Sequence, residues 1–484
     1  MSVFTPGRRW QPPFMPFKQT PFKKRALAKI ELAIKGPLFG CRMCGNCLLQ
    51  ETAFICPMEC PKGLRNGPCG GSTPEKCYVD ESRPCVWYKI YERSFKLGRE
   101  ALLLEVLPPM DWEKAGMDAW SDIFIQAKNI GAKKIVAGLS APGPDSVSKT
   151  LDSIFRPVRQ PSWWQGDSLY HAPKYSEPVS ELERRLKAGE FVVATEVTPP
   201  LSASADKLKE LIELLKPYVA AINFTDSPSA IPRMSSWACS KFALEQKAEP
   251  VMQIAARDRT RVGLQSEVMG ASALGVRNVL CLTGDSMVLG PGPRGRMDIV
   301  DLDAIQMLWI LRRMRDEGKY LDGREVKSPP QYFLGAAASP FASNMKFQAL
   351  REQKKVNAGA QFFQTNVVFD AEALDEWLNE VAKRGVLDKV YILIGITPLK
   401  SYKTAAYMNS KIPGVFVPEK ILKRMEAAKD KGNEREEGVQ IALELIEKIK
   451  TKQGVNGIHV MPVGWEEVVP RIVKEAGLIT RHER

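Results

Sequence analysis

The cysteines are the residues of this chain whose spacing most directly predicts chemistry. Six of the ten lie within about thirty residues near the N-terminus, where Cys41, Cys44 and Cys47 form a Cys-x2-Cys-x2-Cys run. Two-residue gaps let three thiolates converge on one cuboidal [4Fe-4S] cluster. The fourth ligand would be Cys56 or Cys60, each of which precedes a proline, as in the Cys-Pro runs of ferredoxins. The run therefore predicts an iron–sulfur site.

A second four-thiolate site is available from the remaining N-terminal cysteines. Cys69, Cys77 and Cys85 would share it with whichever of Cys56 and Cys60 the first site leaves. Zinc is the alternative to iron, because four-cysteine zinc sites with short gaps also hold small domains together. The chain has only three histidines, none of them near these cysteines, so either site must be almost entirely thiolate.

Composition favours a cytoplasmic protein that keeps these thiols reduced. Basic residues and prolines interrupt every apolar run near the N-terminus, so no signal peptide is expected. No stretch approaches the roughly 18 apolar residues of a transmembrane helix, so membrane insertion is not expected either. In a reducing compartment, clustered cysteines are metal ligands more often than they are disulfides.

Much of the positive charge lies in an N-terminal arm, residues 1–40. The arm holds eight Lys or Arg against one Glu, a net +7 of the chain's +13. Such an arm could bind nucleic acid, but no recognition helix or RNA-binding signature accompanies it, so no nucleic-acid partner is expected. It could also lie over another subunit of a homo-oligomer or of a larger complex. A docking surface for an acidic electron carrier or an anionic substrate fits the neighbouring cysteines better.

A stretch rich in proline, tryptophan and tyrosine divides the chain. It contains RPVRQPSWWQGDSLY, has no apolar periodicity, and predicts a connector over residues 156–189. We expect the connector to be packed, because two adjacent tryptophans rarely face free solvent. The cysteine-rich domain is expected before it, at residues 41–155, and a second domain after it, at residues 190–484.

The second domain alternates short apolar, β-branched runs with amphipathic helical patterns. Eight such runs in about 300 residues predict an α/β fold, the (β/α)8 TIM barrel. A doubly wound sheet is the alternative, but no run is followed by a glycine-rich phosphate-binding sequence. The predicted strands are FVVATEV, VAAINFT, PVMQIAA, NVLCLTG, YFLGAAA, AQFFQT, VYILIGIT and GIHVMPV.

Polar residues gather at the carboxyl ends of these predicted strands, where barrel enzymes place their chemistry. Two of them, Glu196 and Asp285, are carboxylates that finish otherwise apolar strands. Each could be catalytic, could cap the next helix or could lie in a surface loop. The other polar residues at strand ends are Thr225, Asp226, Thr283, Thr365, Asn366, Thr397 and His459.

At these strand ends the chain resembles the methylenetetrahydrofolate reductase family. Five motifs occur in the family's order between residues 190 and 465, namely TEVTPP, LTGD, KVNAGAQFFQTNVVFD, IGITPL and GIHVM. The segments CRMCGNCLLQETAFICPMECPKGLRNGPCGG, CVWYKIYERSFKLGR and PPMDW resemble the cysteine-rich partner of reductases of anaerobic one-carbon metabolism, here fused to the barrel. The two resemblances support each other, because the two parts accompany one another in that family.

The resemblance implies a flavin enzyme that reduces 5,10-methylenetetrahydrofolate to 5-methyltetrahydrofolate. Glu196 stands where the family has its general acid, which opens the imidazolidine ring to the iminium and needs a pKa raised toward neutrality. Asp285 matches the aspartate that lies by the flavin and the pterin, and Gly284 lets the backbone approach the ring. Further flavin contacts are implied at Thr225, Gln253 and Lys355.

Departures from the family pattern widen the choice of cofactor and electron donor. Thr283 and Gln253 replace an arginine and a histidine that could serve a diphosphate or ribityl chain, so FMN fits at least as well as FAD. Asn366 replaces a substrate-binding glutamine with a shorter amide. Thr404 and Met408 replace family contacts to folate and nicotinamide. An iron–sulfur cluster fed by a carrier such as reduced ferredoxin is therefore an alternative to NAD(P)H.

Two other functions remain open from the sequence. The chain could be an electron-relay flavin and iron–sulfur subunit of a larger complex, in which no acid would be needed at Glu196. It could also be a pterin-dependent methyltransferase on the same class of barrel, although a cobalamin-binding signature such as DxHxxG is missing.

Overall fold

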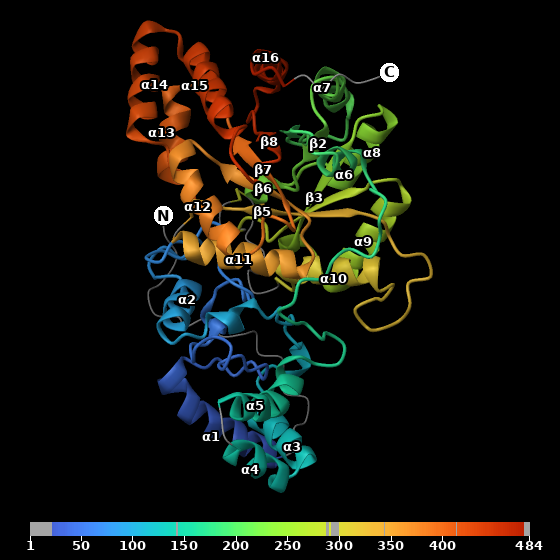
Figure 1. Cartoon of the computed structure of the whole chain (residues 1–484), viewed down its shortest axis with the longest axis vertical. Coiled ribbons are helices and arrows are strands. Elements are labelled where there is room, and N and C mark those ends of the chain that lie inside the picture. Colours follow the sequence, from blue (N-terminus) through green and yellow to red (C-terminus); the bar gives the residue numbers. More distant parts are fainter. Residues whose placement is uncertain are drawn as a thin grey trace.

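The computed structural model describes residues 22–141, 144–286, 290–291, 300–342, 344–412 and 414–478. The upper half of the molecule in Figure 1 is a closed barrel of parallel strands, in which each strand pairs with the next and β8 pairs with β1. The predicted (β/α)8 barrel is confirmed. Its strands are β1 (Val192–Val197), β2 (Ala221–Phe224), β3 (Pro250–Ala255), β4 (Asn278–Leu282), β5 (Phe333–Ala338), β6 (Phe362–Val367), β7 (Tyr391–Ile396) and β8 (Gly457–Val460).

Helices cover the outside of the barrel, and amphipathic stretches predicted between the strands form helices such as α7, α10 and α12. Three helices rather than one connect β7 to β8, an elaboration that the alternation of strand and helix did not predict. The helices are α6 (Glu181–Lys187), α7 (Asp206–Leu215), α8 (Ser236–Glu245), α9 (Arg261–Ala273), α10 (Ala304–Asp316), α11 (Met345–Ala358), α12 (Ala371–Lys383), α13 (Tyr402–Lys411), α14 (Glu419–Lys431), α15 (Glu434–Ile449) and α16 (Val469–Glu475).

Side chains alternate between the barrel interior and the surrounding helices, as they must in parallel strands closed into a barrel. On β1, Val192 and Ala194 belong to the cluster inside the barrel, whereas Val193 and Val197 pack among the helices. The same alternation turns Glu196 inward at the carboxyl end of the strand. Strand register therefore decides which polar residues reach the barrel mouth.

Apolar side chains fill the amino-terminal half of the barrel interior. Phe333 and Phe362 stack there with ring centroids 4.8 Å apart, beside Val251, Leu280 and Leu393. A Cβ atom at Gly335 would lie 2.2 Å from the Phe362 ring, so only glycine fits beside it. This packing closes one end of the barrel and leaves the carboxyl ends of the strands as the open end.

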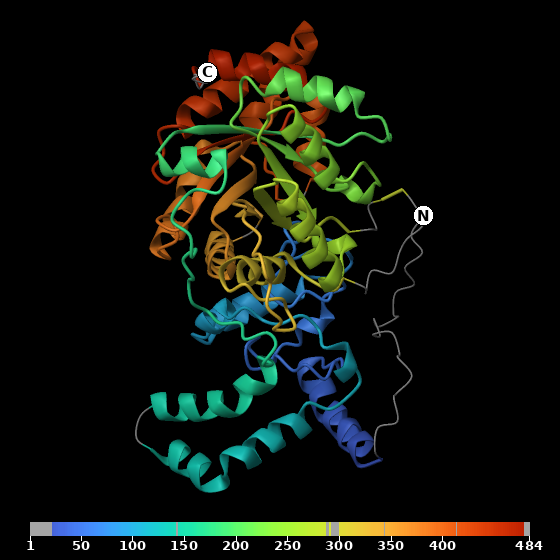
Figure 2. The ribbon, with the colours of Figure 1, turned by 90° about the vertical axis from the view of Figure 1, so that its right-hand side faces the viewer.

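The N-terminal region lies below the barrel in Figure 1 and has two layers. Next to the barrel lie the cysteine-bearing loops and α2 (Val86–Lys96). Farther away lies a helical lobe, seen at the foot of Figure 2. The lobe contains α1 (Phe22–Phe39), α3 (Trp120–Ile130), α4 (Ala132–Ser140) and α5 (Pro144–Arg159). No helix in the described part of the chain has the length and apolar character needed to cross a bilayer.

The barrel contributes to the core of the cysteine-rich layer. Phe347 and Leu350 of α11 are buried in the same hydrophobic cluster as Cys60, Cys69 and Cys85. The rings of Tyr88, Tyr91 and Phe95 on α2 surround Phe347, with centroids 5.1 to 6.4 Å from its own. The two parts therefore share one packed seam.

Helix α10 is buried around its whole circumference, although its sequence predicts an amphipathic helix. Its residues Ala304–Arg315 are all buried. Asp303 and Gln306 form a capping box at its start, and the Gln306 amide also donates to the Leu107 carbonyl at 3.1 Å. The N-terminal region covers the face that would otherwise meet solvent.

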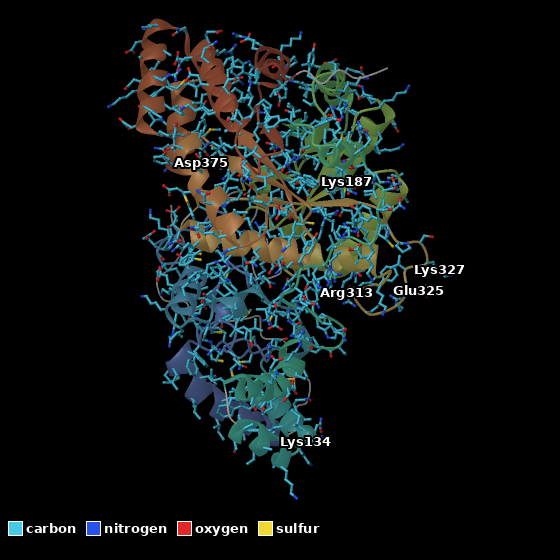
Figure 3. The ribbon with its side chains drawn as sticks, in the orientation of Figure 1. Lys134, Lys187, Arg313, Glu325, Lys327 and Asp375 are labelled. Atoms are coloured by element: carbon cyan, nitrogen blue, oxygen red, sulfur yellow. The ribbon has the colours of Figure 1, made fainter. Side chains whose placement is uncertain are left out.

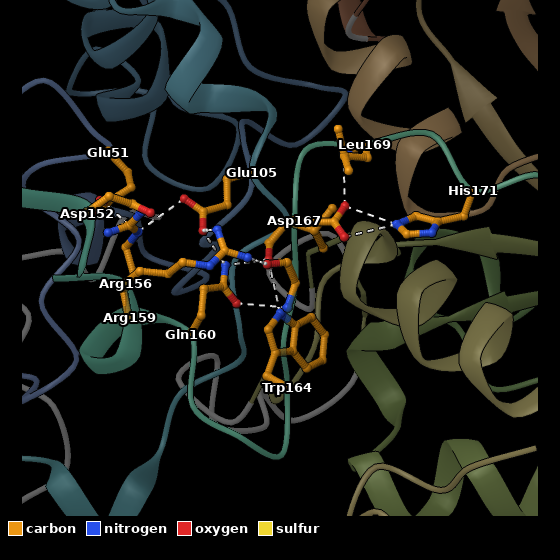
Figure 4. Close-up of polar contacts among 12 residues, drawn as sticks. Glu51, Glu105, Asp152, Arg156, Arg159, Gln160, Trp164, Asp167, Leu169 and His171 are labelled. Carbon is orange, nitrogen blue, oxygen red and sulfur yellow. Dashed lines mark hydrogen bonds and ion pairs between the residues drawn. The ribbon is translucent and has the colours of Figure 1, made fainter. Parts of the chain in front are cut away.

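A buried polar network fastens the helical lobe and the connector to the cysteine-bearing loops (Figure 4). Arg159 of α5 lies 3.1 Å from carboxylate oxygens of both Glu51 and Glu105. Burial raises the pKa of Glu51 to about 7. Trp164 in the connector is fully buried and donates from its indole to the Val106 carbonyl at 3.0 Å, so the prediction that this stretch packs is confirmed.

Candidate functional site

A carboxylate and an imidazole meet at the barrel mouth. Glu196 is the next-to-last residue of β1, and His459 lies on the adjacent strand β8, where it is register partner to Ala194. The Glu196 Oε2 and His459 Nε2 atoms are 3.5 Å apart, and the Glu196 side chain is 21% exposed against 3% for His459. This pair can hold and exchange a proton with a molecule seated at the mouth.

Just below this pair, two amides bridge the barrel interior. Asn223 of β2 and Gln364 of β6 donate to each other's carbonyl oxygens, at 2.5 and 3.1 Å. Both side chains are almost fully buried. The bridge satisfies polar groups that would otherwise be costly to bury, and it gives the mouth a polar floor.

Three buried polar atoms at the mouth have no hydrogen-bond partner within the described residues. They are Thr225 Oγ1 after β2, Thr397 Oγ1 after β7 and His459 Nδ1 on β8. Strand alternation turns all three residues toward the barrel interior. Buried polar groups are nearly always satisfied, so these atoms are available to a polar ligand such as a flavin or a pterin.

The loop after β4 brings Thr283, Gly284 and Asp285 to the same mouth. Gly284 has φ +83°, and a Cβ atom there would lie 3.1 Å from side-chain atoms of Ala255 and Arg257. Arg257 follows β3 and donates to the Asp285 carbonyl at 3.2 Å. A cation thus approaches this loop from the neighbouring strand, although Thr283 occupies the position at which the family resemblance placed an arginine.

Asp285 connects the barrel to the cysteine-rich layer. Its carboxylate accepts from the Tyr78 hydroxyl at 3.3 Å and from the Ser229 backbone N–H at 2.7 Å. Burial, with Asp285 beside it, raises the pKa of Tyr78. Lys62 of the same layer donates to the Gly284 carbonyl at 2.9 Å. The cysteine-bearing loops therefore rest directly on the loop that the sequence singled out.

Other predicted site residues of the barrel are buried or hydrogen-bonded within the fold. Gln253 is buried on β3, and Asn366 ends β6 with its Oδ1 accepting from the Val367 N–H at 2.8 Å. Lys355 of α11 donates to the Ala337 carbonyl at 2.5 Å, and burial lowers the pKa of its amine to about 7. These side chains lie at or beneath the strand ends.

Thr404 and Met408 already have structural roles in α13. The Thr404 hydroxyl lies 3.0 Å from that of Ser401, whose side chain also caps the helix. Met408 is only 4% exposed and packs in the hydrophobic core. Neither side chain needs a nicotinamide or a folate to account for its environment.

The eight N-terminal cysteines separate into two groups of four. The first lines a cavity of about 20 Å³ beside α1, and the second lines one of about 100 Å³ beside α2. Cys56 lines the first cavity and Cys60 the second, while the metal-binding role of each stays a prediction. The first group is Cys41, Cys44, Cys47 and Cys56, and the second group is Cys60, Cys69, Cys77 and Cys85.

The two groups differ in exposure. Cys41, Cys44 and Cys47 are partly exposed, whereas Cys56 and every member of the second group are buried. Burial raises the pKa of the Cys56 and Cys60 thiols to about 12. Thiols in such surroundings become thiolates only when a cation accompanies them.

The loop that carries the first group contains residues in left-handed backbone conformations, which residues other than glycine rarely adopt. Met43, Ala53 and Phe54 all have φ between +49° and +62°. A Cβ atom at Gly45 would lie 2.1 Å from the Lys114 carbonyl oxygen, so the loop can pass there only as glycine. Backbone strain of this kind persists where the surroundings fix the chain, as they do at binding sites.

Within the residues that the structure describes, no three Cys, His, Asp or Glu side chains gather closely enough to hold a single metal ion. A tetrahedral zinc site needs sulfur atoms about 3.8 Å apart, given Zn–S bonds of about 2.3 Å. A cuboidal cluster binds each thiolate through a different iron atom and so holds them farther apart. Two groups of four thiols have the ligand number of either a four-cysteine zinc site or a [4Fe-4S] cluster, so the identity of the metal stays a prediction.

Sequence reasoning missed several of the residues that meet here. Strand alternation alone could have placed Asn223 and Gln364 inside the barrel, because both are polar residues at inward positions of apolar strands. His459 was recognised only as a polar strand end. No local signal links Tyr78 to Asp285 or Arg257 to Gly284, because those contacts join distant segments.

Comparison with known proteins gives matches to both parts of the chain. A family model described as "Methylenetetrahydrofolate reductase" matches residues 181–477, and one described as "Methylene-tetrahydrofolate reductase C terminal" matches residues 20–113. A solved structure of an uncharacterized protein from Clostridium thermocellum, which binds two copies of 5-methyl-5,6,7,8-tetrahydrofolic acid, aligns with a TM-score of 0.44 at 18% identity. That alignment covers 61% of this chain and 97% of the other.

Two curated relatives match part of the chain. "Methylenetetrahydrofolate reductase 2" of Schizosaccharomyces pombe is 30% identical over 227 residues, which is 44% of this chain and 33% of the relative. "Probable methylenetetrahydrofolate reductase (NADPH)" of Caenorhabditis elegans is 25% identical over 214 residues, 43% of this chain and 29% of the relative. The match thus spans about a third of the length of these relatives. Since the first family model covers more than half of the residues, the chain belongs to the methylenetetrahydrofolate reductase family.

Proposed function

We propose that this chain reduces 5,10-methylenetetrahydrofolate to 5-methyltetrahydrofolate through a bound flavin, with electrons delivered from the cysteine-rich layer. The observation that carries the proposal is the Glu196–His459 pair beside unsatisfied polar atoms at the mouth of a barrel of this family. A holder of flavin alone would need no proton donor at that place. The whole reaction needs two electrons and two protons for each methylene group.

Glu196 is the proposed general acid. Its carboxyl would protonate the ring nitrogen of the substrate, so that the five-membered ring opens to the electrophilic iminium. His459, 3.5 Å away, orients the carboxyl and can resupply its proton. Asp285, held by Tyr78 and Ser229, is placed to accept hydrogen bonds from the pterin ring.

The residues at the mouth fit a flavin. Thr225, Thr397 and His459 offer unsatisfied polar atoms. Arg257, which pairs with Asp258, holds the loop of Gly284 and Asp285 through its bond to the Asp285 carbonyl. When bound, the flavin supplies hydride transfer to the one-carbon unit. FMN and FAD are both proposed, because these residues would contact the flavin ring that the two cofactors share.

The cysteine groups are proposed to hold two [4Fe-4S] clusters, one in each cavity. The clusters would supply one-electron transfer, and the second group stands closer to the barrel site because Cys77 directly precedes Tyr78, whose hydroxyl contacts Asp285. The same contact supports a second candidate function, an electron-relay subunit. Glu196 distinguishes the reductase function from the relay function, because an electron relay needs no general acid at that position.

Anaerobically purified protein is expected to contain about eight iron atoms, four per cluster, and about one flavin per chain. Iron, zinc and flavin assays on one sample, with a visible spectrum, test this directly. Stoichiometric zinc without iron would instead make the cysteine groups structural, and NAD(P)H would become the expected electron donor.

Tyr78→Phe is expected to lower kcat/KM for methylenetetrahydrofolate reduction by roughly tenfold, the scale of one hydrogen bond to a charged group. The change deletes only the hydroxyl that donates to Asp285, so the flavin midpoint potential or the substrate KM should shift as well. Tyr88→Phe is the matched control, because its hydroxyl accepts from Gln348 away from the mouth. Equal behaviour of the two variants would show that Asp285 works without Tyr78.

A further inference from the structure

Helix α1 buries charged side chains and exposes apolar ones. Its charged residues Glu31 and Lys35 are 2% and 7% exposed, whereas Ile30, Ile34 and Leu38 are 53%, 45% and 65% exposed. These three apolar residues recur every four positions and so form one stripe along the helix. A helix normally buries its apolar stripe, so this one presents a surface shaped for contact with something else.

The neighbouring helices also carry exposed apolar residues. Helix α1 packs on α3, and α3 packs on α4. Phe124 and Ile125 of α3 are 59% and 56% exposed, and Val136 of α4 is 61% exposed. The outward sides of these helices are called the α1–α3–α4 face below.

The same helices carry exposed lysines. Lys29, Lys128, Lys133 and Lys134 are exposed, and no ion pair involves them in the described part of the chain. Figure 3 shows Lys134 at the lower end of the molecule, farthest from the barrel. The acidic side chains on α1 and α3 are already engaged, Glu31 with Lys35 and Asp122 with Lys114. The face is therefore complementary to an acidic partner.

The α1–α3–α4 face also borders the more exposed cysteine group. Glu31 lines the cavity of that group, and the Lys35 amine lies 3.5 Å from Cys47 Sγ. Glu31 also accepts from the backbone N–H groups of Ala119 and Trp120, which joins α1 to the start of α3. A partner seated on this face would thus approach Cys41, Cys44 and Cys47 and not the buried second group.

We propose that the α1–α3–α4 face docks a small acidic protein that carries one electron at a time. The inference rests on the proposed iron–sulfur role of the first cysteine group. Each encounter would remove one electron from the reduced carrier, so one methylene group reduced to methyl would consume two reduced carriers and two protons. Exposed apolar residues together with exposed lysines on the same helices suit the small, transient interfaces of electron-transfer pairs.

The test uses the full-length, iron-loaded protein and a reduced, acidic two-cluster ferredoxin as the probe. The rate of ferredoxin oxidation by the protein, followed by stopped flow, should fall as salt is raised. At low salt the double variant K133E/K134E should be slower by about tenfold, the lower end of electrostatic steering. The matched control K420E/K423E, on α14 at the other end of the molecule, should equal the wild type.

A second variant probes the apolar stripe. Ile34→Ser should raise the KM for ferredoxin while leaving iron content unchanged. A ferredoxin rate that is independent of salt and equal in all variants would overturn the docking proposal. So would a dimer in sedimentation that K133E/K134E dissociates with the ferredoxin rate unaltered, because the face would then bind a second copy of this chain.

Failure of this proposal can be told apart from failure of the proposed function. Iron content and reduction of methylenetetrahydrofolate by a dye that reduces flavin directly are measured on the same samples. If both are normal and the rate of ferredoxin oxidation is the same in all variants, only the docking proposal is wrong. If the wild type lacks iron or dye-driven turnover, the proposed function itself is wrong.

Discussion

Glu196→Gln is expected to keep its fold and its flavin while losing methylenetetrahydrofolate reduction by about 100-fold or more, the scale of general acid catalysis. The amide has nearly the shape of the carboxyl but cannot release a proton to the substrate nitrogen. It can still lie beside His459, which is 3.5 Å from the native carboxylate. The measurement is steady-state turnover with dye-reduced enzyme, alongside flavin content and the rate of flavin reduction by the same dye.

Glu210→Gln is the matched control, because that glutamate is exposed on α7, outside the barrel. It should behave as the wild type in every assay. Near-normal turnover in Glu196→Gln would remove this residue from the chemistry and favour the electron-relay function. Loss of flavin in Glu196→Gln would assign the residue to cofactor binding instead.

Cys44→Ser is expected to abolish ferredoxin-driven turnover while dye-driven turnover persists. The substitution removes one thiolate of the first group, so about four of the expected eight iron atoms should be lost together with their paramagnetic signal in the reduced protein. The flavin should stay bound, because the mouth lies in the barrel and the first group lies beside α1.

Cys69→Ser makes the same change in the second group and should remove the other half of the iron. Cys239→Ser is the control, since Cys239 is buried in α8 and belongs to neither group. If one substitution removed all the iron, the eight cysteines would not form two independent sites. Undiminished ferredoxin-driven turnover in both variants would show that electrons enter by another route.

The barrel could be predicted from the sequence because its signal is repeated and local. Runs such as VYILIGIT are apolar on both faces, as strands buried between a barrel core and its helices must be. The amphipathic stretch at α12 has the helical period of the finished helix. The extra helices α14 and α15 escaped prediction because the number of helices between two strands is not fixed by the pattern of the strands.

The sequence predicted those site residues that stand directly at the ends of strands. Glu196 and Asp285 stand out because a carboxylate after an apolar run is conspicuous in one dimension. Their partners do not stand out, since Tyr78 lies 207 residues before Asp285 and His459 lies on the last strand. The allocation of Cys56 and Cys60 depended on how the loops fold over one another, which spacing alone left open.

The seam between α2 and α11 joins the cores of the two parts of the chain. Because Phe347 and Leu350 complete a core that also contains Cys60, Cys69 and Cys85, each part covers some apolar surface that the other part alone would leave exposed. One polypeptide keeps the two parts in equal number, and the packing of Cys60, Cys69 and Cys85 beside Phe347 and Leu350 couples the second cysteine group to the framework of the barrel.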